Sequence, residues 1–359
     1  IESGGNYNTV VGDEAGTALT TGDYSTFVGY AAGDATTTGL DNTALGALAL
    51  TSNTVGAYNV AIGQSALHNN VDGSNSVAIG RLALYAQDPA SAADMNNVAV
   101  GYLSGTAATT ATASTLIGSQ AGSALTSGIN NTAVGAFSLN ADTLGKFSVA
   151  VGNGALERQN FTSSTNVYNT AVGYDAGSRI TTGTQNTLIG GLAGDAITTA
   201  SNNTAVGYNS LTTNTTGTTN AATGWYSLNL NTTGSQNAAF GERALRSNTT
   251  ASFNTAVGAL ALTANTTGTR NTAVGAYTLD TSTTGDQNTA VGFYAGLSVT
   301  TGVNNTLIGG LAGDAITTGA ENTAVGKGAL SANTTAANNT AVGYNSLSLT
   351  TTGTGNAST

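Results

Sequence analysis

The chain has 359 residues, of which 7% are charged and one is proline, and its formal net charge is −10. This acidic balance argues against nucleic acid and anionic membrane surfaces as partners, because both are negatively charged. The chain contains no cysteine and no run of about 18 apolar residues that would predict a membrane-spanning helix. We therefore expect no nucleic-acid binding and no membrane insertion in this segment.

A seventeen-residue repeat runs through the whole chain. Each copy centres on a sequence such as Asn-Thr-Ala-Val-Gly, and the closing residue, here called the repeat glycine, occurs twenty times between Gly12 and Gly343. Seventeen of the nineteen intervals are seventeen residues long, and the intervals Gly80–Gly101 and Gly152–Gly173 are twenty-one. A constant period with rare short insertions indicates a solenoid, in which each copy stacks on its neighbours.

Each copy predicts a strand followed by a turn. The segment before the repeat glycine is rich in Val, Ile and Thr, and a second glycine follows ten residues later in most copies. The predicted fold is all-β: a parallel β-solenoid, or β-roll, of about twenty coils, in one continuous domain over residues 1–359. The insertions, Gln87 to Asp94 and Gln159 to Thr165, are expected to be surface loops. Because the repeat begins and ends without a polar cap, we expect a segment of a longer chain or fibre.

An asparagine column is expected to hold the coils in register. The residue four before the repeat glycine is Asn in sixteen copies and Ser in the other four. Stacked Asn amides can hydrogen-bond along the axis of the solenoid. Alternatively, Asn is present for its turn conformation. The predicted ladder includes Asn203, Asn220, Asn254 and Asn271.

Three strand positions, called strand-start, strand-centre and strand-end, lie three, two and one residues before the repeat glycine. The strand-end residue is Val, Ile, Leu or Phe in all copies but one, and we expect it to point into the coil. Leu occurs four residues after the repeat glycine in twelve copies, and Gly in the other eight. The predicted core includes Val134, Val206, Val257, Val274, Leu211 and Leu262.

The strand-centre residue is Ala in most copies. Adjacent strand side chains point to opposite faces, so this alanine column is expected to face outward. A small apolar outer column suggests close packing between chains. The residues predicted to pack there are Ala133, Ala205 and Ala273.

The position four residues after the repeat glycine, called the Leu/Gly position, predicts an exchange of volume. When it is Gly, an apolar residue usually follows three residues later, where many Leu copies have Asn. The copies with a large strand-centre residue all have Gly at this position: Phe27, Leu116, Leu188 and Leu307. A close-packed interior demands such compensation.

Residues that carry catalysis are scarce. His68 is the only histidine, the carboxylates are scattered, and zinc sites need clustered Cys or His. We predict no catalytic residues, no bound metal and no cofactor. Aromatic residues often follow the repeat glycine, as at Tyr208, Trp225 and Phe293. They could stack on sugars, but the favoured interpretation is that they cover turns.

The strand motif resembles the head repeats of YadA-like trimeric autotransporter adhesins. Three segments carry the resemblance: Ser76-Val77-Ala78-Ile79-Gly80, Ser148-Val149-Ala150-Val151-Gly152 and Asn59-Val60-Ala61-Ile62-Gly63, followed by Ala83, Ala155 and Ala66 at the matching offset. The Asn-Thr-Ala-Val-Gly variant also resembles repeat arrays of phage tail fibres and bacterial surface proteins. The resemblance covers the whole chain and implies a left-handed parallel β-roll and association of three parallel chains.

The function expected from these features is structural or adhesive, without catalysis. The chain would be the shaft or head of a trimeric adhesin or tail fibre, located outside the cell, on its surface or on a virion. Its partners would be copies of itself, as a trimer or as filament neighbours, and a host or environmental surface. One alternative is a self-assembling extracellular filament subunit with coils stacked end to end. Another is an ice-binding solenoid, since Thr-Thr pairs recur, although such pairs supply one outward rank of Thr.

Overall fold

The computed structural model describes residues 5–359, and no helix occurs among them. The part described thus offers no helix that could cross a membrane. The chain divides near residue 182 into two units, residues 5–182 and 183–359, and each is described by itself. Both units are parallel β-solenoids with the seventeen-residue repeat, so the predicted fold class is confirmed. A single continuous domain and left-handed winding stay predictions.

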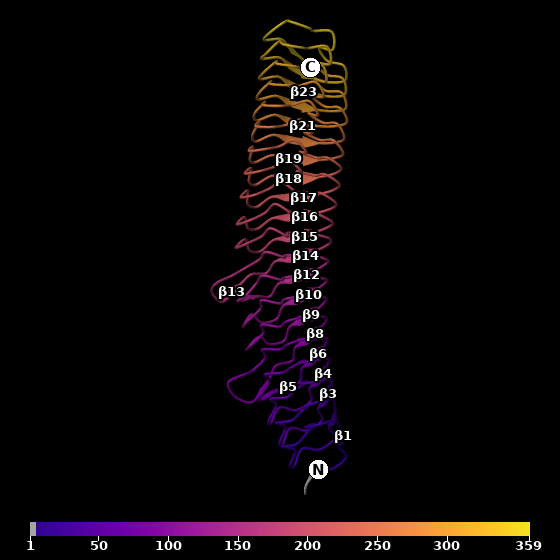
Figure 1. Cartoon of the computed structure of the whole chain (residues 1–359). Coiled ribbons are helices and arrows are strands. Elements are labelled where there is room, and N and C mark those ends of the chain that lie inside the picture. Colours follow the sequence, from indigo (N-terminus) through magenta and orange to yellow (C-terminus); the bar gives the residue numbers. More distant parts are fainter. Residues whose placement is uncertain (1–4) are drawn as a thin grey trace. The chain divides into compact units, whose positions relative to one another are not determined.

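The main strand ladder of the first unit has ten short strands, one in each copy of the repeat, each paired in parallel with the strand of the next copy (Figure 1). The pairing is in register, so that Thr26 lies opposite Thr9 and each position forms a column. The strands are β1 (Thr9–Val11), β2 (Thr26–Val28), β3 (Thr43–Leu45), β4 (Val60–Ile62), β6 (Val77–Ile79), β8 (Val98–Val100), β9 (Thr115–Ile117), β10 (Thr132–Val134), β12 (Val149–Val151) and β14 (Thr170–Val172).

The second unit repeats the arrangement without insertions. Its consecutive strands also pair in parallel, with Thr272 opposite Thr255. The strands are β15 (Thr187–Ile189), β16 (Thr204–Val206), β17 (Ala221–Thr223), β18 (Ala238–Phe240), β19 (Thr255–Val257), β20 (Thr272–Val274), β21 (Thr289–Val291), β22 (Thr306–Ile308), β23 (Thr323–Val325), β24 (Thr340–Val342) and β25 (Ala357–Ser358).

The two insertions form loops that project from the first unit (Figure 1). Each loop adds a small parallel pair: β5 (Gly73–Ser74) with β7 (Ala93–Asp94), and β11 (Gly145–Lys146) with β13 (Thr165–Asn166). Most loop side chains are exposed, as predicted, but Gln87 and Gln159 at the loop bases are 0% exposed. The insertions therefore extend the turn outward without opening the coil.

The repeat glycine is required by the close stacking of the coils. At Gly258 the backbone has a φ of +137°, and a Cβ would lie 2.5 Å from the carbonyl oxygen of Gly275 in the next copy. Any side chain there would overlap the neighbouring backbone, and this φ is one that residues with a Cβ rarely adopt.

The interior of each coil is lined by the strand-centre position, which the sequence-based interpretation placed outside. Three alanines at this position are 0% exposed within the single chain: Ala133, Ala205 and Ala273. Four predicted core residues at the strand-end position are instead partly exposed, by 38% at Val257: Val134, Val206, Val257 and Val274. The predicted orientation of both columns was wrong. The alanines fill the coil, and the valines form its outer face.

The width of the coil explains this orientation. Leu211 and Leu262, at the Leu/Gly position, are 0% exposed as predicted and fill the space beside the strand. The strand-centre side chain shares that space, as contacts in the Gly copies demonstrate. Close packing leaves room for only a methyl group beside a leucine, so the bulkier strand residue takes the outer face.

Leu307 shows why glycines at the Leu/Gly position occur in neighbouring copies. A Cβ on Gly313 of the same copy, or on Gly296 of the preceding copy, would lie 2.7 Å from a Leu307 methyl carbon. The same arrangement recurs at Leu116 with Gly105 and Gly122, and at Phe27 with Gly16 and Gly33. One large strand-centre side chain thus needs a glycine in its own coil and in the coil before it.

The predicted relocation of apolar volume is also confirmed. The apolar residues three positions after these glycines are at most 5% exposed: Leu19, Leu125, Ile180, Ile197, Val299 and Ile316. A Cβ on Gly313 would lie 2.8 Å from Ile316 Cδ1, so the two positions share one interior space.

Candidate functional site

The predicted asparagine ladder is present and links each coil to the next. Asn203, Asn220, Asn254 and Asn271 are at most 1% exposed. The Oδ1 of Asn203 accepts a hydrogen bond from the backbone N–H of Asn220 at 3.0 Å, and that of Asn254 accepts one from Asn271 at 2.9 Å. The Nδ2 of Asn254 donates to the carbonyl of Gly268 at 2.8 Å. The ladder is therefore structural, and it joins side chains mainly to backbone groups.

A second polar column lies inside the coil, seven residues after the repeat glycine. In the second unit, Asn231, Asn248 and Asn265 each donate from Nδ2 to the Oδ1 of the preceding Asn at 2.8–2.9 Å. The Oδ1 of Asn265 has no hydrogen-bond donor, because Ser282 occupies the next step and its Oγ is also unpaired. This column was not predicted as a ladder, although Asn had been noted at the position.

Asp142 occupies this column in the first unit and is 0% exposed. Its carboxylate accepts hydrogen bonds from Gln159 Nε2 at 2.7 Å and from the backbone N–H groups of Gly145 and Phe161 at 3.1 and 3.2 Å. Burial raises the pKa of Asp142, and these hydrogen bonds oppose that rise only in part. An ionisable group has thus replaced an amide in the interior.

The strand-start and strand-end positions together form the outer face of the strand ladder. In residues 183–359 the strand-start residue is Thr in eight of ten complete copies, and the strand-end residue is apolar in nine. Phe240 is 43% exposed and Ile308 is 39% exposed. Neither position is charged in any copy.

The outer face is a regular array. Two residues along a strand span about 6.6 Å, and successive strands lie about 4.8 Å apart, so ten strands offer an area on the order of 300 Å². The face combines an apolar rank with a rank that is mostly Thr, and its area is comparable to the largest patch of an ordinary soluble monomer, which is often functional. The outer face carries no charged residue at either strand position, and sequence reasoning missed it because the strand orientation was inverted.

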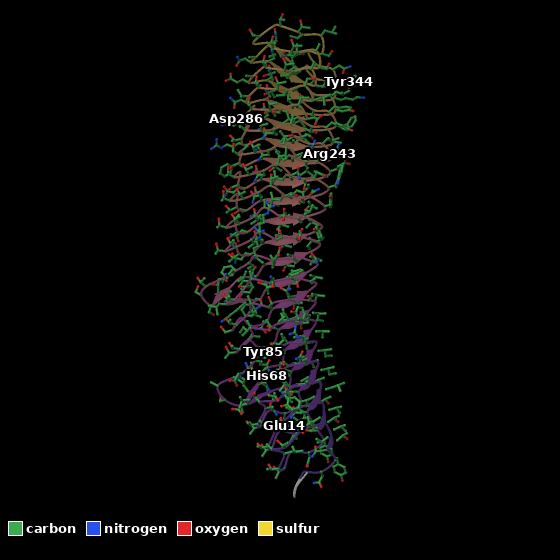
Figure 2. The ribbon with its side chains drawn as sticks, in the orientation of Figure 1. Glu14, His68, Tyr85, Arg243, Asp286 and Tyr344 are labelled. Carbon is green, nitrogen blue, oxygen red and sulfur yellow. The ribbon has the colours of Figure 1, made fainter. Side chains whose placement is uncertain are left out.

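Aromatic side chains gather beside the repeat glycines at the turn that follows each strand. Tyr208, Trp225 and Phe293 are 51%, 42% and 54% exposed, and whether they cover the turns, as expected, stays a prediction. Phe293 contacts Tyr294, with ring centroids 3.9 Å apart. Arg243 projects from the same side of the second unit as Tyr344 (Figure 2).

Within residues 5–359, arginines lie over aromatic rings in three places: Arg81 over Tyr102 at 5.7 Å, Arg270 over Phe253 at 5.8 Å, and, closest of the three, Arg243 over Trp225. The Arg243 guanidinium carbon lies 4.6 Å from the centre of the Trp225 ring. Trp225, Tyr226, Arg243 and Arg246 line an open hollow of about 200 Å³. Trp225 had been noted in the sequence, whereas the two arginines had not. Their departure from the usual repeat residues was the signal that could have found them.

His68 lies elsewhere on the first unit. Its ring stacks on Tyr85 at 5.0 Å, and its Nδ1 is 2.8 Å from the Oδ1 of Asn69. No group of three His, Cys, Asp or Glu side chains that could hold a metal occurs in residues 5–359. These contacts place His68 in a surface stack with an aromatic ring.

Comparison with protein-family models and with curated proteins finds no match.

Proposed function

We propose that the chain is a segment of an extracellular structural or adhesive fibre, without catalytic activity. Identical chains would associate in parallel through the outer face of the strand ladder. The observation that carries this proposal is the uncharged, Thr- and Val-rich outer face, which every copy of the repeat extends by one row. The alanine column is buried within each chain and does not support association between chains. The outer face is the surface that supports it instead.

A second copy of the chain is the partner that best fits this face. Its strands repeat at the same spacing of about 4.8 Å, so rows of side chains can interdigitate along each unit. Burying Val and Ile between chains favours association by about 25 cal/mol for each Å² of apolar area removed from water. Three chains rather than two is the arrangement implied by the resemblance to adhesin heads.

Sedimentation of a charge variant tests the proposal. The double variant Val206→Glu/Val274→Glu should convert trimers to monomers that keep their β-structure, because the new carboxylates are solvated in a monomer and unpaired in an interface. The control Thr233→Glu/Thr267→Glu places the same charge on exposed turn residues and should leave the mass unchanged. A monomeric wild type at high concentration, or an unchanged mass for the valine variant, would contradict the proposal.

Ice binding is a second candidate that the outer face favours. The Thr-Thr pairs, such as Thr266-Thr267, lie on turns, but the strand ladder supplies two outward ranks, one of Thr and one of Val or Ile. These two ranks are additional to the single outward rank expected from the Thr-Thr pairs. Thermal hysteresis by a monomeric protein, abolished by Val206→Glu/Val274→Glu, would favour ice binding over self-association.

A further inference from the structure

We propose that the hollow beside Trp225 binds an acidic saccharide, namely a sugar residue that carries a single carboxylate within an otherwise neutral glycan. This proposal rests on the adhesive role proposed above and names the class of ligand to which the chain would adhere. Its residues are Trp225, Tyr226, Arg243 and Arg246, which line the hollow.

The register of the coils builds the site. The backbone N–H of Tyr226 donates to the carbonyl of Tyr208 at 3.2 Å, and that of Arg243 donates to the carbonyl of Trp225 at 2.9 Å. The second residue after a repeat glycine therefore lies beside the first residue after the repeat glycine of the preceding copy. This rule places Tyr208, Tyr226, Trp225 and Arg243 together although they come from three copies of the repeat.

The aromatic residues supply a sugar-stacking surface. Trp225 and Tyr226 pack edge to face, with ring centroids 4.7 Å apart and an interplanar angle of 83°. Tyr208 lies 6.1 Å from Tyr226, also edge to face. Exposed, mutually braced rings offer large apolar faces at low entropic cost, and the C–H face of a sugar ring is a matching partner.

The arginines specify an acidic sugar. Arg243 lies against Trp225, and Arg246 is exposed on the same hollow, whose lining contains no carboxylate. A guanidinium binds a carboxylate through two parallel hydrogen bonds, which a neutral sugar cannot match. The chain has only eight basic residues, and two of them lie at this hollow.

A cation–π contact that merely stabilises the turn accounts for only part of the site. Such contacts are worth about 0.5–1 kcal/mol at exposed positions and would explain Arg243. They leave the placement of Arg246 unexplained. The net charge of −10 disfavours a polyanion, so an isolated carboxylate is the better match. A volume of about 200 Å³ suits one sugar ring of a longer glycan.

The sole tryptophan makes the test specific, because the intrinsic tryptophan fluorescence of the full chain reports on Trp225 alone. The probe is aldotetraouronic acid, a xylotriose that carries one glucuronate, and unbranched xylotriose is its neutral counterpart. Titration with the acid should give a saturable fluorescence change. Xylotriose should bind at least about tenfold more weakly, which corresponds to the loss of a charged hydrogen bond.

Two variants locate the binding to the arginine. Arg246→Ala should weaken binding of the acid about tenfold and leave binding of xylotriose unchanged, and Arg246→Lys should fall between wild type and Arg246→Ala. The matched control is Phe293→Ala. Phe293 also follows a repeat glycine and packs on Tyr277 and Tyr294, in a cluster without arginine, so this variant should bind the acid like wild type.

The proposal is overturned if the acid gives no saturable change, if xylotriose binds equally well, or if Arg246→Ala binds the acid like wild type. Sedimentation of the same sample measures whether the chain self-associates, so failure of the saccharide site can be distinguished from failure of the proposed fibre. A monomer that still binds the acid would refute the fibre and leave the saccharide site standing.

Discussion

The space shared by Leu307 and Gly313 allows a direct test of how the coil is filled. In Gly313→Ala the new Cβ would lie 2.7 Å from Leu307 Cδ2 and 2.8 Å from Ile316 Cδ1, well inside the roughly 3.5 Å of ordinary carbon contacts. Overpacking of this kind costs about 1–3 kcal/mol. The φ of +57° adds about 1–2 kcal/mol for a residue with a Cβ. We expect Gly313→Ala to lower the free energy of unfolding by about 2–5 kcal/mol.

The same substitution should cost less once Leu307 is shortened. Leu307 is 0% exposed, and Leu307→Ala alone should destabilise the coil by about 3–5 kcal/mol through lost burial and a cavity. In that background the new methyl group no longer meets Leu307, and the terminal methyl of Ile316 can move into the vacated space, so that mainly the backbone cost of about 1–2 kcal/mol remains. The double-mutant cycle should therefore give a coupling energy of about 1–3 kcal/mol.

Native-state hydrogen exchange is the suitable assay, because repeat proteins can unfold locally. The amide of Thr306, which donates to the carbonyl of Asn322 at 2.8 Å, reports on the stability of the affected coils. Gly310→Ala is the control. Its Cβ would meet only one atom within 4 Å, at 3.8 Å, so we expect a change within about 0.5 kcal/mol. A coupling energy below about 0.5 kcal/mol would refute the shared space.

Three further predictions follow from the interior columns. Asp142→Asn should raise the melting temperature at pH 7 and remove a pH dependence. Burial raises the pKa of Asp142 in the folded state above its unfolded value of about 4. The wild type therefore loses stability as the pH rises from about 4 through the folded-state pKa, and thermal unfolding measured across pH 3–7 would reveal this loss. Ala205→Glu should destabilise its coil by several kcal/mol, whereas Val206→Glu should keep the monomer folded; equal melting of the two would contradict the strand orientation. Leu262→Gly removes a buried side chain, but the φ of 52° at this position favours glycine, so we expect a net loss of about 1–4 kcal/mol in the free energy of urea unfolding. Adding Asn265→Ile should recover part of that loss.

The fold could be predicted from the sequence because its main determinant is periodic. The interval between repeat glycines fixes the coil length, and the column of Asn254 and its equivalents fixes the register through hydrogen bonds between adjacent coils. Neither inference needs the direction of any side chain. The predictions of coil length and of register were therefore correct although the strand orientation was predicted wrongly.

The orientation of the strand was predicted wrongly because size was taken as a guide to burial. Val257 is larger than Ala256, yet Val257 is 38% exposed and Ala256 is 0% exposed. The sequence did contain the correct signal. Leu307 and its equivalents occur only where the Leu/Gly position is glycine, and two positions that exchange volume must face the same space. Pairing of the glycine copies needed coordinates, because it depends on contacts between neighbouring coils.

The interior and the exterior of this solenoid differ in how freely they can change. Inside, a change at Leu307 is tied to Gly296 and Gly313, so interior substitutions must occur in sets. Outside, residues such as Trp225 and Arg246 alter the surface without touching those sets. The register then determines which outer residues become neighbours. Recognition sites on this chain should therefore be sought where the outer turn residues depart from the repeat, because the stacking of the coils does not dictate those departures.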